Sequence, residues 1–145
     1  MVIVFDMDNT LVDEFGRGLR PGIMDLILKL EKDGHQLVLW TSSTRKRAKW
    51  ILAEQGLKAH FSEAVFREDY DPENSGLPKD IRQVAGTFLV DDDPKQINFV
   101  RGVKLQGFLI APYRSGKALD PAELGRLQRA IRRAALKERV LGWFG

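Results

Sequence analysis

Two acidic side chains, two positions apart, follow the first apolar run of the chain. Asp6 and Asp8 come directly after residues 2–5 (VIVF), whose composition is typical of a buried strand. In open α/β sheets, ligands bind just beyond the carboxyl ends of the strands. Two carboxylates at such a place suggest either a site for a hard cation or a pair in which one acid is a nucleophile and the other transfers a proton.

Two more polar clusters follow later apolar runs. The Thr-Ser-Ser segment 41–43 comes after residues 36–40 (QLVLW), and three consecutive aspartates, 91–93, come after residues 87–90 (TFLV). Because the carboxyl ends of parallel strands lie along one edge of a sheet, we expect the three clusters to converge although they are far apart in the sequence. Lys79 lies in the segment that leads into the later run, so its side chain can reach the same edge.

These residue types together have the groups that phosphoryl transfer needs. Clustered carboxylates repel one another, and a divalent cation with oxygen ligands relieves that repulsion. A free carboxylate beside the cation can attack phosphorus and form an aspartyl-phosphate. A hydroxyl and an ammonium then hold the other phosphoryl oxygens, and a second carboxyl gives the leaving group its proton and later activates water.

The rest of the sequence predicts a scaffold that would bring the clusters together. Apolar runs predict strands at residues 2–5, 36–40, 60–66, 87–90 and 106–110. Apolar spacing and capping residues predict helices from Pro21 to about 32, from Ser43 or Thr44 to about Gln55, over 79–84, from 94 to about 100, and from Pro121 onward. Residues 11–20 are expected to form a loop or small hairpin flap, and residues 69–78 a loop. Strands that alternate with helices predict a parallel sheet covered on both faces.

Length and composition limit the alternatives. The chain of 145 residues is expected to form one domain, and its 43% hydrophobic and 30% charged residues are typical of a soluble globular protein. The lack of cysteine excludes disulfides, thiolate metal ligands and a cysteine nucleophile, and it is consistent with a cytoplasmic protein. We see no signal peptide, membrane span, Walker motif or Gly-rich nucleotide loop.

The positive charge of the chain is concentrated near its C-terminus. Residues 112–145 have eight Lys and Arg against three Asp and Glu. A basic segment of this kind can bind nucleic acid or an acidic partner, but we favour a solvated helix face. Leu124, Leu127 and Ile131 are spaced to dock on the sheet, and Trp143 and Phe144 are expected to pack into the core rather than to form a self-association patch.

With these motifs the chain resembles the haloacid dehalogenase (HAD) superfamily of phosphohydrolases. Its first motif, an apolar run followed by D-x-D-x-T, is present as VIVFDMDNTL, and its second, an apolar strand followed by Thr or Ser, as LVLWTSS. A lysine forms the third motif and paired acids after a strand form the fourth, here TFLVDDDP. The motifs occur in family order and span residues 1 to about 111.

Within the superfamily, two capless groups are most similar to this chain. One contains phosphatases that act on the C-terminal domain of RNA polymerase II, and it shares Arg20-Pro21-Gly22, Phe66-Arg67 and Lys79-Asp80-Ile81. The other is the magnesium-dependent phosphatase group, whose fourth motif also has two adjacent acids. The first group has D-L-D-E-T where this chain has DMDNT, so the resemblance leaves the substrate open.

The resemblance implies roles for the residues that match the first two motifs. Asp6 would be the nucleophile and a metal ligand. Asp8 would be the general acid and base, and its backbone carbonyl would bind Mg²⁺. Thr41 would bind the phosphoryl group, and Ser42 and Asn9 are assigned to substrate binding.

The later motifs complete the predicted site. Lys79 would neutralise the phosphoryl charge, although Lys46, Lys49 and Lys95 are alternatives for this position. Asp92 would be a direct metal ligand with Asp91 in support, and Asp93 is expected only to cap a helix. His35 and His60 are expected to be structural.

We therefore predict a Rossmann-like three-layer α/β/α sandwich with about five parallel strands and no separate cap domain. The strand order 5-4-1-2-3 is implied by the resemblance. A single domain, 1–145, would include a basic C-terminal helix and tail at 120–145.

The predicted activity is Mg²⁺-dependent hydrolysis of phosphomonoesters through an aspartyl-phosphate. An open site suits a phosphorylated protein or another bulky substrate, although a small molecule is also possible. The alternatives are a polynucleotide 3′-phosphatase that uses the basic helix and a non-catalytic phosphate-binding module. No membrane partner is expected, and the oligomeric state is open.

Overall fold

Parallel strands form the centre of the molecule. The computed structural model describes residues 1–144, with side chains up to Trp143. Its sheet has the strand order β3-β2-β1-β4-β5, which is the predicted order read from the opposite edge. The strands are β1 (Val2–Phe5), β2 (Gln36–Trp40), β3 (Glu63–Val65), β4 (Phe88–Asp91) and β5 (Gln106–Leu109). All four neighbouring pairs are parallel, so the polar segments that follow β1, β2 and β4 leave the sheet at one edge.

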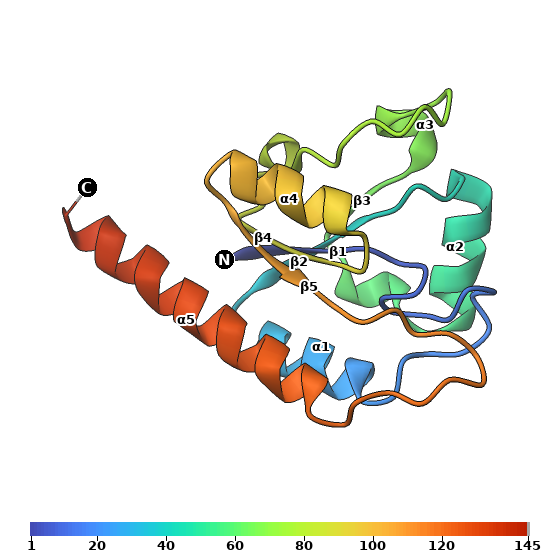
Figure 1. The fold of residues 1–145 in the computed structure, drawn as a ribbon, viewed down its shortest axis with the longest axis horizontal. Helices are drawn as coiled ribbons and strands as arrows, with labels where there is room; N and C mark the ends of the chain where they lie inside the picture. Colours follow the sequence, from blue (N-terminus) through green and yellow to red (C-terminus); the bar gives the residue numbers. More distant parts are fainter. Residues whose placement is uncertain (145) are drawn as a thin grey trace.

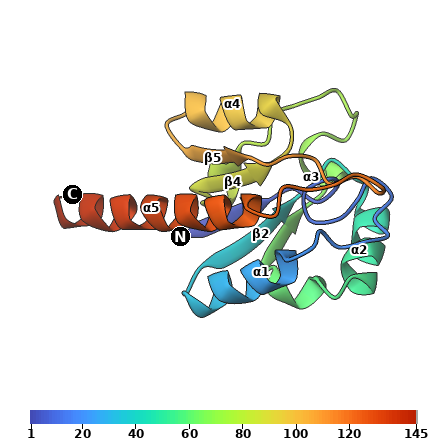
Figure 2. The same ribbon diagram turned by 60° about the horizontal axis from the view of Figure 1, so that its bottom comes forward.

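Alternating strand side chains build a core on each face of the sheet. Ile3 and Phe5 belong to the larger core, whereas Val4 between them belongs to the smaller one. The larger core also contains apolar side chains from α1 (Ile23–Lys32), α2 (Arg45–Glu54) and α5 (Glu123–Phe144). The smaller contains side chains from α4 (Pro94–Gly102) and the 3₁₀ turn η2 (Ile81–Val84). Figures 1 and 2 show the resulting three layers, which confirm the predicted fold class.

Local sequence explains where the helices that flank the site begin. The Thr44 hydroxyl accepts a hydrogen bond from the Arg47 backbone N–H and caps α2. The Asp93 carboxylate accepts one from the Lys95 backbone N–H at 3.0 Å and caps α4, whose first residue is Pro94. Both helices therefore begin directly after a polar segment at the carboxyl edge of the sheet, as predicted.

The segment between β1 and α1 is short and folds back on itself. Val12 forms isolated bridges with Asp8 and with Leu19, which gives residues 11–20 the predicted character of a small hairpin flap. In the described residues the flap is the only structure between β1 and α1, and this agrees with the predicted lack of a cap domain.

The region between α2 and β4 differs from the prediction. The third strand is confined to Glu63–Val65, because Lys58–His60 forms the 3₁₀ turn η1 and Phe66 begins a turn of its own. The Phe66 backbone N–H donates to Asp69 Oδ2 at 2.9 Å and starts the single-turn helix α3 (Arg67–Tyr70). A loop was expected from residue 69, and a single helical turn is too short to show apolar periodicity. The helix expected over 79–84 is reduced to η2.

The C-terminal helix is longer than the sheet that it covers. Leu127 and Ile131 are buried in the larger core, and Arg129, Arg132 and Arg133 are exposed as predicted. A helix of 22 residues spans about 33 Å, whereas the longest strand, with five residues, spans about 17 Å. The last turns of α5 therefore extend past the body of the molecule (Figures 1 and 2).

This length makes one packing prediction wrong. The Trp143 side chain is 76% exposed and does not enter the core, because it lies on the part of α5 that has no sheet beneath it. The side chain of Phe144 lies outside the described residues. Among the helices described, none has the length and apolar character needed to cross a membrane.

Candidate active site

The three polar clusters meet at the carboxyl edge of the sheet, as predicted from their positions at the ends of parallel strands. They surround a cavity of about 190 Å³. Predicted site residues that line this cavity come from the segments after β1 and β2, from the end of β4 and the residue after it, and from the segment before η2. They are Asp6, Asp8, Asn9, Ser42, Lys79, Asp91 and Asp92. Thr41 is the one predicted site residue that does not line it.

Asp6 is held in one orientation at the floor of the cavity. Its backbone N–H donates to Val90 O at 3.0 Å, which continues the pairing of β1 with β4 beyond Phe5. Its carboxylate accepts from the Thr10 hydroxyl at 2.9 Å and from Lys79 Nζ at 2.9 Å, one bond on each oxygen. Both partners are buried, so these contacts fix the direction in which the Asp6 carboxylate points.

Lys79 joins two carboxylates that belong to different strands. Its ammonium lies 2.9 Å from Asp6 Oδ1 and 2.8 Å from Asp91 Oδ2, and the residue is only 4% exposed. Its backbone N–H donates to Gln96 Oε1 at 2.8 Å, which anchors it to α4. Although burial lowers the pKa of Lys79, the two carboxylates raise it above its ordinary value. The alternatives Lys46, Lys49 and Lys95 are exposed and do not line the cavity.

Three acids lie close enough to share a cation. Asp6, Asp91 and Asp92 each offer a carboxylate oxygen, and these oxygens lie within 4.8 Å of one another. Burial raises the pKa of Asp91 to about 6 and the pKa of Asp92 to about 7, and the neighbouring Asp6 contributes to both shifts. Three hard oxygen donors in a small polar cavity fit Mg²⁺, which prefers carboxylate ligands and keeps room for water and phosphate.

Asp8 lies at the rim of the cavity and has a partner that the sequence did not predict. Arg47, in the first turn of α2, donates from Nη1 to Asp8 Oδ2 at 2.9 Å and from Nη2 to Asp8 Oδ1 at 2.8 Å. The same Nη1 lies 3.0 Å from Ser43 Oγ. Both oxygens of Asp8 are therefore occupied by one guanidinium group.

The segment after β2 presents Ser42 to the cavity and turns Thr41 away from it. The Thr41 backbone N–H donates to Val65 O at 2.9 Å, and its hydroxyl accepts from the Ser43 backbone N–H at 3.0 Å. Thr41 thus shapes the turn, and its residue is buried. Asn9 has a positive φ of 64°, and its side-chain oxygen is buried with no hydrogen-bond partner. A buried polar atom of this kind at a cavity is consistent with a partner supplied by a ligand.

Three further residues contribute to the site without having been predicted. Thr10 and Gln96 fix Asp6 and Lys79, as described above, and Tyr70 of α3 lines the cavity. The Tyr70 ring packs edge-on against Trp40 at 5.3 Å between centroids, and burial raises the pKa of its hydroxyl. The last threonine of DMDNT was a signal for Thr10, but nothing local to residues 70 or 96 indicated a role.

Solved structures share this fold at low sequence identity. A hydrolase from Streptococcus pneumoniae TIGR4 is 14% identical, with 77% of this chain and 92% of that chain covered and a TM-score of 0.61. A putative beta-phosphoglucomutase from Thermotoga maritima is also 14% identical, with coverages of 86% and 90% and a TM-score of 0.61. The core domain of a putative phosphoglycolate phosphatase from S. pneumoniae TIGR4 is 17% identical, with coverages of 88% and 94% and a TM-score of 0.57. These likenesses concern the fold alone.

The family comparison identifies the family of the chain, which the likeness in fold does not. A search of curated proteins finds no match, but the model of the NLI interacting factor-like phosphatases matches residues 1–140, nearly the whole chain. The matched region contains all the carboxylates that surround the cavity. The chain therefore belongs to the NLI interacting factor-like phosphatase family of the HAD superfamily, and it is a phosphatase.

Proposed function

We propose that the chain hydrolyses phosphomonoesters with Mg²⁺ and through an aspartyl-phosphate on Asp6. The observation that supports this most strongly is the setting of the Asp6 carboxylate. It is fixed by Lys79 and Thr10, it faces the cavity, and it lies beside two further carboxylates. A nucleophile needs such a fixed orientation toward its target.

The proposed metal ligands are the Asp6 and Asp92 carboxylates and the backbone carbonyl of Asp8, with Asp91 in support. The pKa values of Asp91 and Asp92 are raised because burial and mutual repulsion disfavour their charged forms. When bound, Mg²⁺ would neutralise these charges and polarise a phosphoryl oxygen. Asp91 also accepts from the Asp93 backbone N–H at 3.0 Å and from Lys79, so its orientation is set by the protein.

The remaining groups have distinct proposed tasks. An oxygen of Asp6 attacks phosphorus, and the bond between phosphorus and the ester oxygen breaks. Asp8 gives a proton to the departing oxygen, then takes one from the water that cleaves the acyl phosphate. Lys79 and the Ser42 hydroxyl stabilise the charge on the transferring group, and the Asn9 amide N–H donates to it.

An open rim leaves room for a large substrate. In the described residues the flap 11–20 is the only segment between β1 and α1, and no lid domain lies over the cavity. This supports a substrate whose phosphate protrudes from a protein or another bulky molecule.

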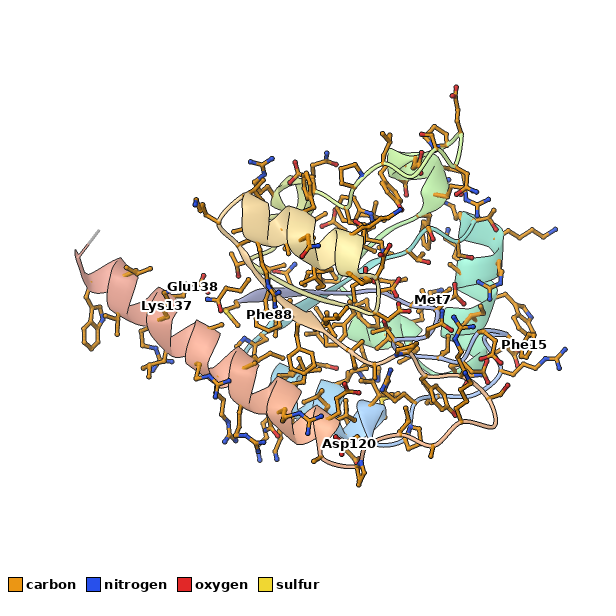
Figure 3. The ribbon with its side chains drawn as sticks, in the orientation of Figure 1. Met7, Phe15, Phe88, Asp120, Lys137 and Glu138 are labelled. Carbon is orange, nitrogen blue, oxygen red and sulfur yellow. The ribbon has the colours of Figure 1, made fainter. Side chains whose placement is uncertain are left out.

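The second half of α5, marked by Lys137 and Glu138, and the flap, marked by Phe15, lie at opposite ends of the long axis in Figure 3. That separation gives no support to a nucleic-acid track along the basic helix.

Metal removal tests the proposal. Purified protein in Mg²⁺ should hydrolyse 4-nitrophenyl phosphate, a chelator should abolish the hydrolysis, and excess Mg²⁺ should restore it. Asp6→Asn should be inactive under all three conditions, which controls for a contaminating phosphatase. Full activity in the chelator would contradict the metal role. Phosphate binding without turnover would favour the non-catalytic module.

A further inference from the structure

The pairing of Asp8 with Arg47 has a geometry that matters for substrate choice. The guanidinium binds the carboxylate through two nearly equal bonds of 2.9 and 2.8 Å, so it presents a planar fork to two oxygens. Arg47 reaches Asp8 from α2, which packs beside the flap, and the Gln55 side chain donates to Gly16 O at 3.2 Å on the same side. Arg47 therefore lies beside the cavity through its contact with Asp8, which lines it.

Arg47 binds the Asp8 carboxyl group, which the proposed function uses as the general acid. The inference rests on that function, in which Asp8 gives its proton to the oxygen of the leaving group. To give a proton, Asp8 must carry it on one of the two oxygens that accept from Arg47, and that oxygen must then turn toward the ester oxygen. At least one of the two bonds must break before the ester oxygen is protonated.

The pair is accessible enough to be exchanged. The Arg47 and Asp8 side chains are 39% and 27% exposed, so the pair can be reached from solvent. An incoming anion that offers Arg47 a second pair of oxygens can replace Asp8, because it restores both bonds of the fork. Carboxylates and phosphates both match the arginine fork.

Two further arginines accompany Arg47 on α2 and α3. Arg67 Nε donates to Ser42 O at 2.8 Å, and Arg45 pairs with Asp69. Arg47 and Arg67 each contact a residue that lines the cavity, Asp8 and Ser42 respectively, whereas the charge of Arg45 is balanced by Asp69. Asp8 would contact the ester oxygen, so Arg47 lies on the leaving-group side of the site.

We propose that Arg47 determines specificity by exchanging Asp8 for a second anionic group of the substrate. The substrate class is then a phosphomonoester whose leaving group has a carboxylate or a second phosphate close to the ester oxygen. Binding of that anion releases Asp8 for proton transfer, so recognition of the correct substrate and freeing of the acid are one event.

A matched pair of esters tests this exchange. 2-Phosphoglycolate and ethyl phosphate have nearly the same size, but only the first has a second anionic group. The wild type in Mg²⁺ should prefer 2-phosphoglycolate by at least about tenfold in kcat/KM, the effect of one good additional interaction. The bisphosphate of ethylene glycol serves as a third probe, and its rank against 2-phosphoglycolate shows whether a phosphate or a carboxylate is the better partner.

Substitution of Arg47 should move the two substrates in opposite directions. Arg47→Met should raise KM for 2-phosphoglycolate because the anion loses its partner. The same variant should raise kcat for ethyl phosphate because Asp8 is no longer occupied. Arg47→Lys, which keeps the charge but loses the fork, should give an intermediate preference. Lys46→Met removes an exposed charge from the same turn of α2 and should keep the wild-type preference.

The outcomes separate this inference from the function on which it rests. If Arg47→Met changes both substrates by the same factor, or if the wild type shows no preference, Arg47 has only a structural role and the exchange is refuted. In that case Mg²⁺-dependent hydrolysis of both esters still supports the proposed function. If the wild type hydrolyses neither ester nor 4-nitrophenyl phosphate, the proposed function fails first, and the exchange fails with it.

Discussion

The ammonium of Lys79 lies 2.9 Å from Asp6 Oδ1, although the two residues are 73 positions apart in the sequence. The same nitrogen lies 2.8 Å from Asp91 Oδ2. The buried Lys79 ammonium thus links the end of β1 to the end of β4 at the point where the proposed chemistry occurs. Catalysis and stability are therefore coupled at this residue.

Replacement of Lys79 should reduce both activity and stability. Lys79→Met leaves two buried carboxylates without their cation, and breaking a buried ion pair in this way costs about 3–5 kcal/mol. We expect that loss in the free energy of unfolding, measured by urea titration in chelator, together with loss of phosphatase activity. Lys95→Met, at an exposed position of α4, should change stability by less than about 0.5 kcal/mol. Equal stability of the two variants would contradict the buried ion pair.

The acidic cluster should make the metal-free protein less stable as the pH rises. The pKa of Asp92 is raised from 3.8 to about 7 and that of Asp91 from 3.8 to about 6. From about pH 3.8 to about pH 7 the folded state therefore binds more protons than the unfolded state. Stability therefore falls with increasing pH across this window and levels off above pH 7. Urea unfolding in chelator at several pH values measures the slope, and Asp92→Asn should flatten it. A slope of the opposite sign would show that other groups dominate.

Metal binding should reverse that trend. Mg²⁺ competes with protons for the same oxygens, so its stabilising effect should be larger at pH 8 than at pH 5. Thermal unfolding with and without Mg²⁺ at the two pH values measures this difference. The same shift at both values would place the cation away from Asp91 and Asp92.

The contribution of α5 can be tested with two leucines on one helix. Leu127 is fully buried in the larger core, whereas Leu136 is 61% exposed. Leu127→Ala should destabilise the fold by about 2–5 kcal/mol, and Leu136→Ala by less than about 0.5 kcal/mol. Similar losses for both would mean that the end of α5 is covered in solution.

The sequence predicted the parts of this protein that depend on local patterns. The run VIVF before Asp6 and the run TFLV before Asp91 identified two neighbouring strands, and parallel pairing then required their polar ends to meet. Lys79 was placed by the family resemblance, and its burial between two acids agrees with that position. The short turns around Phe66 were missed, because three or four residues are too few to show a period.

What the sequence could not predict depends on distant pairing. Arg47 was one of several basic residues on α2, and only the fold brings it to Asp8, 39 positions earlier. Tyr70 and Gln96 line the cavity because of how α3 and α4 are placed, and no local signal distinguishes them. Trp143 is exposed because α5 is longer than the strands that it covers. The sequence of α5 alone does not show where the sheet beneath it ends.

The proposed aspartyl-phosphate on Asp6 can be trapped chemically. Asp8→Asn should slow breakdown of the intermediate, since general acid and base catalysis contributes about 10²–10⁴-fold. The variant would be mixed with 4-nitrophenyl phosphate and Mg²⁺, quenched in acid and treated with borohydride, which reduces an acyl phosphate to an alcohol. We predict that mass spectrometry finds homoserine at position 6 and that Asp6→Asn shows no modification. Reduction at another residue, or turnover by Asp6→Asn, would show that Asp6 is not the nucleophile.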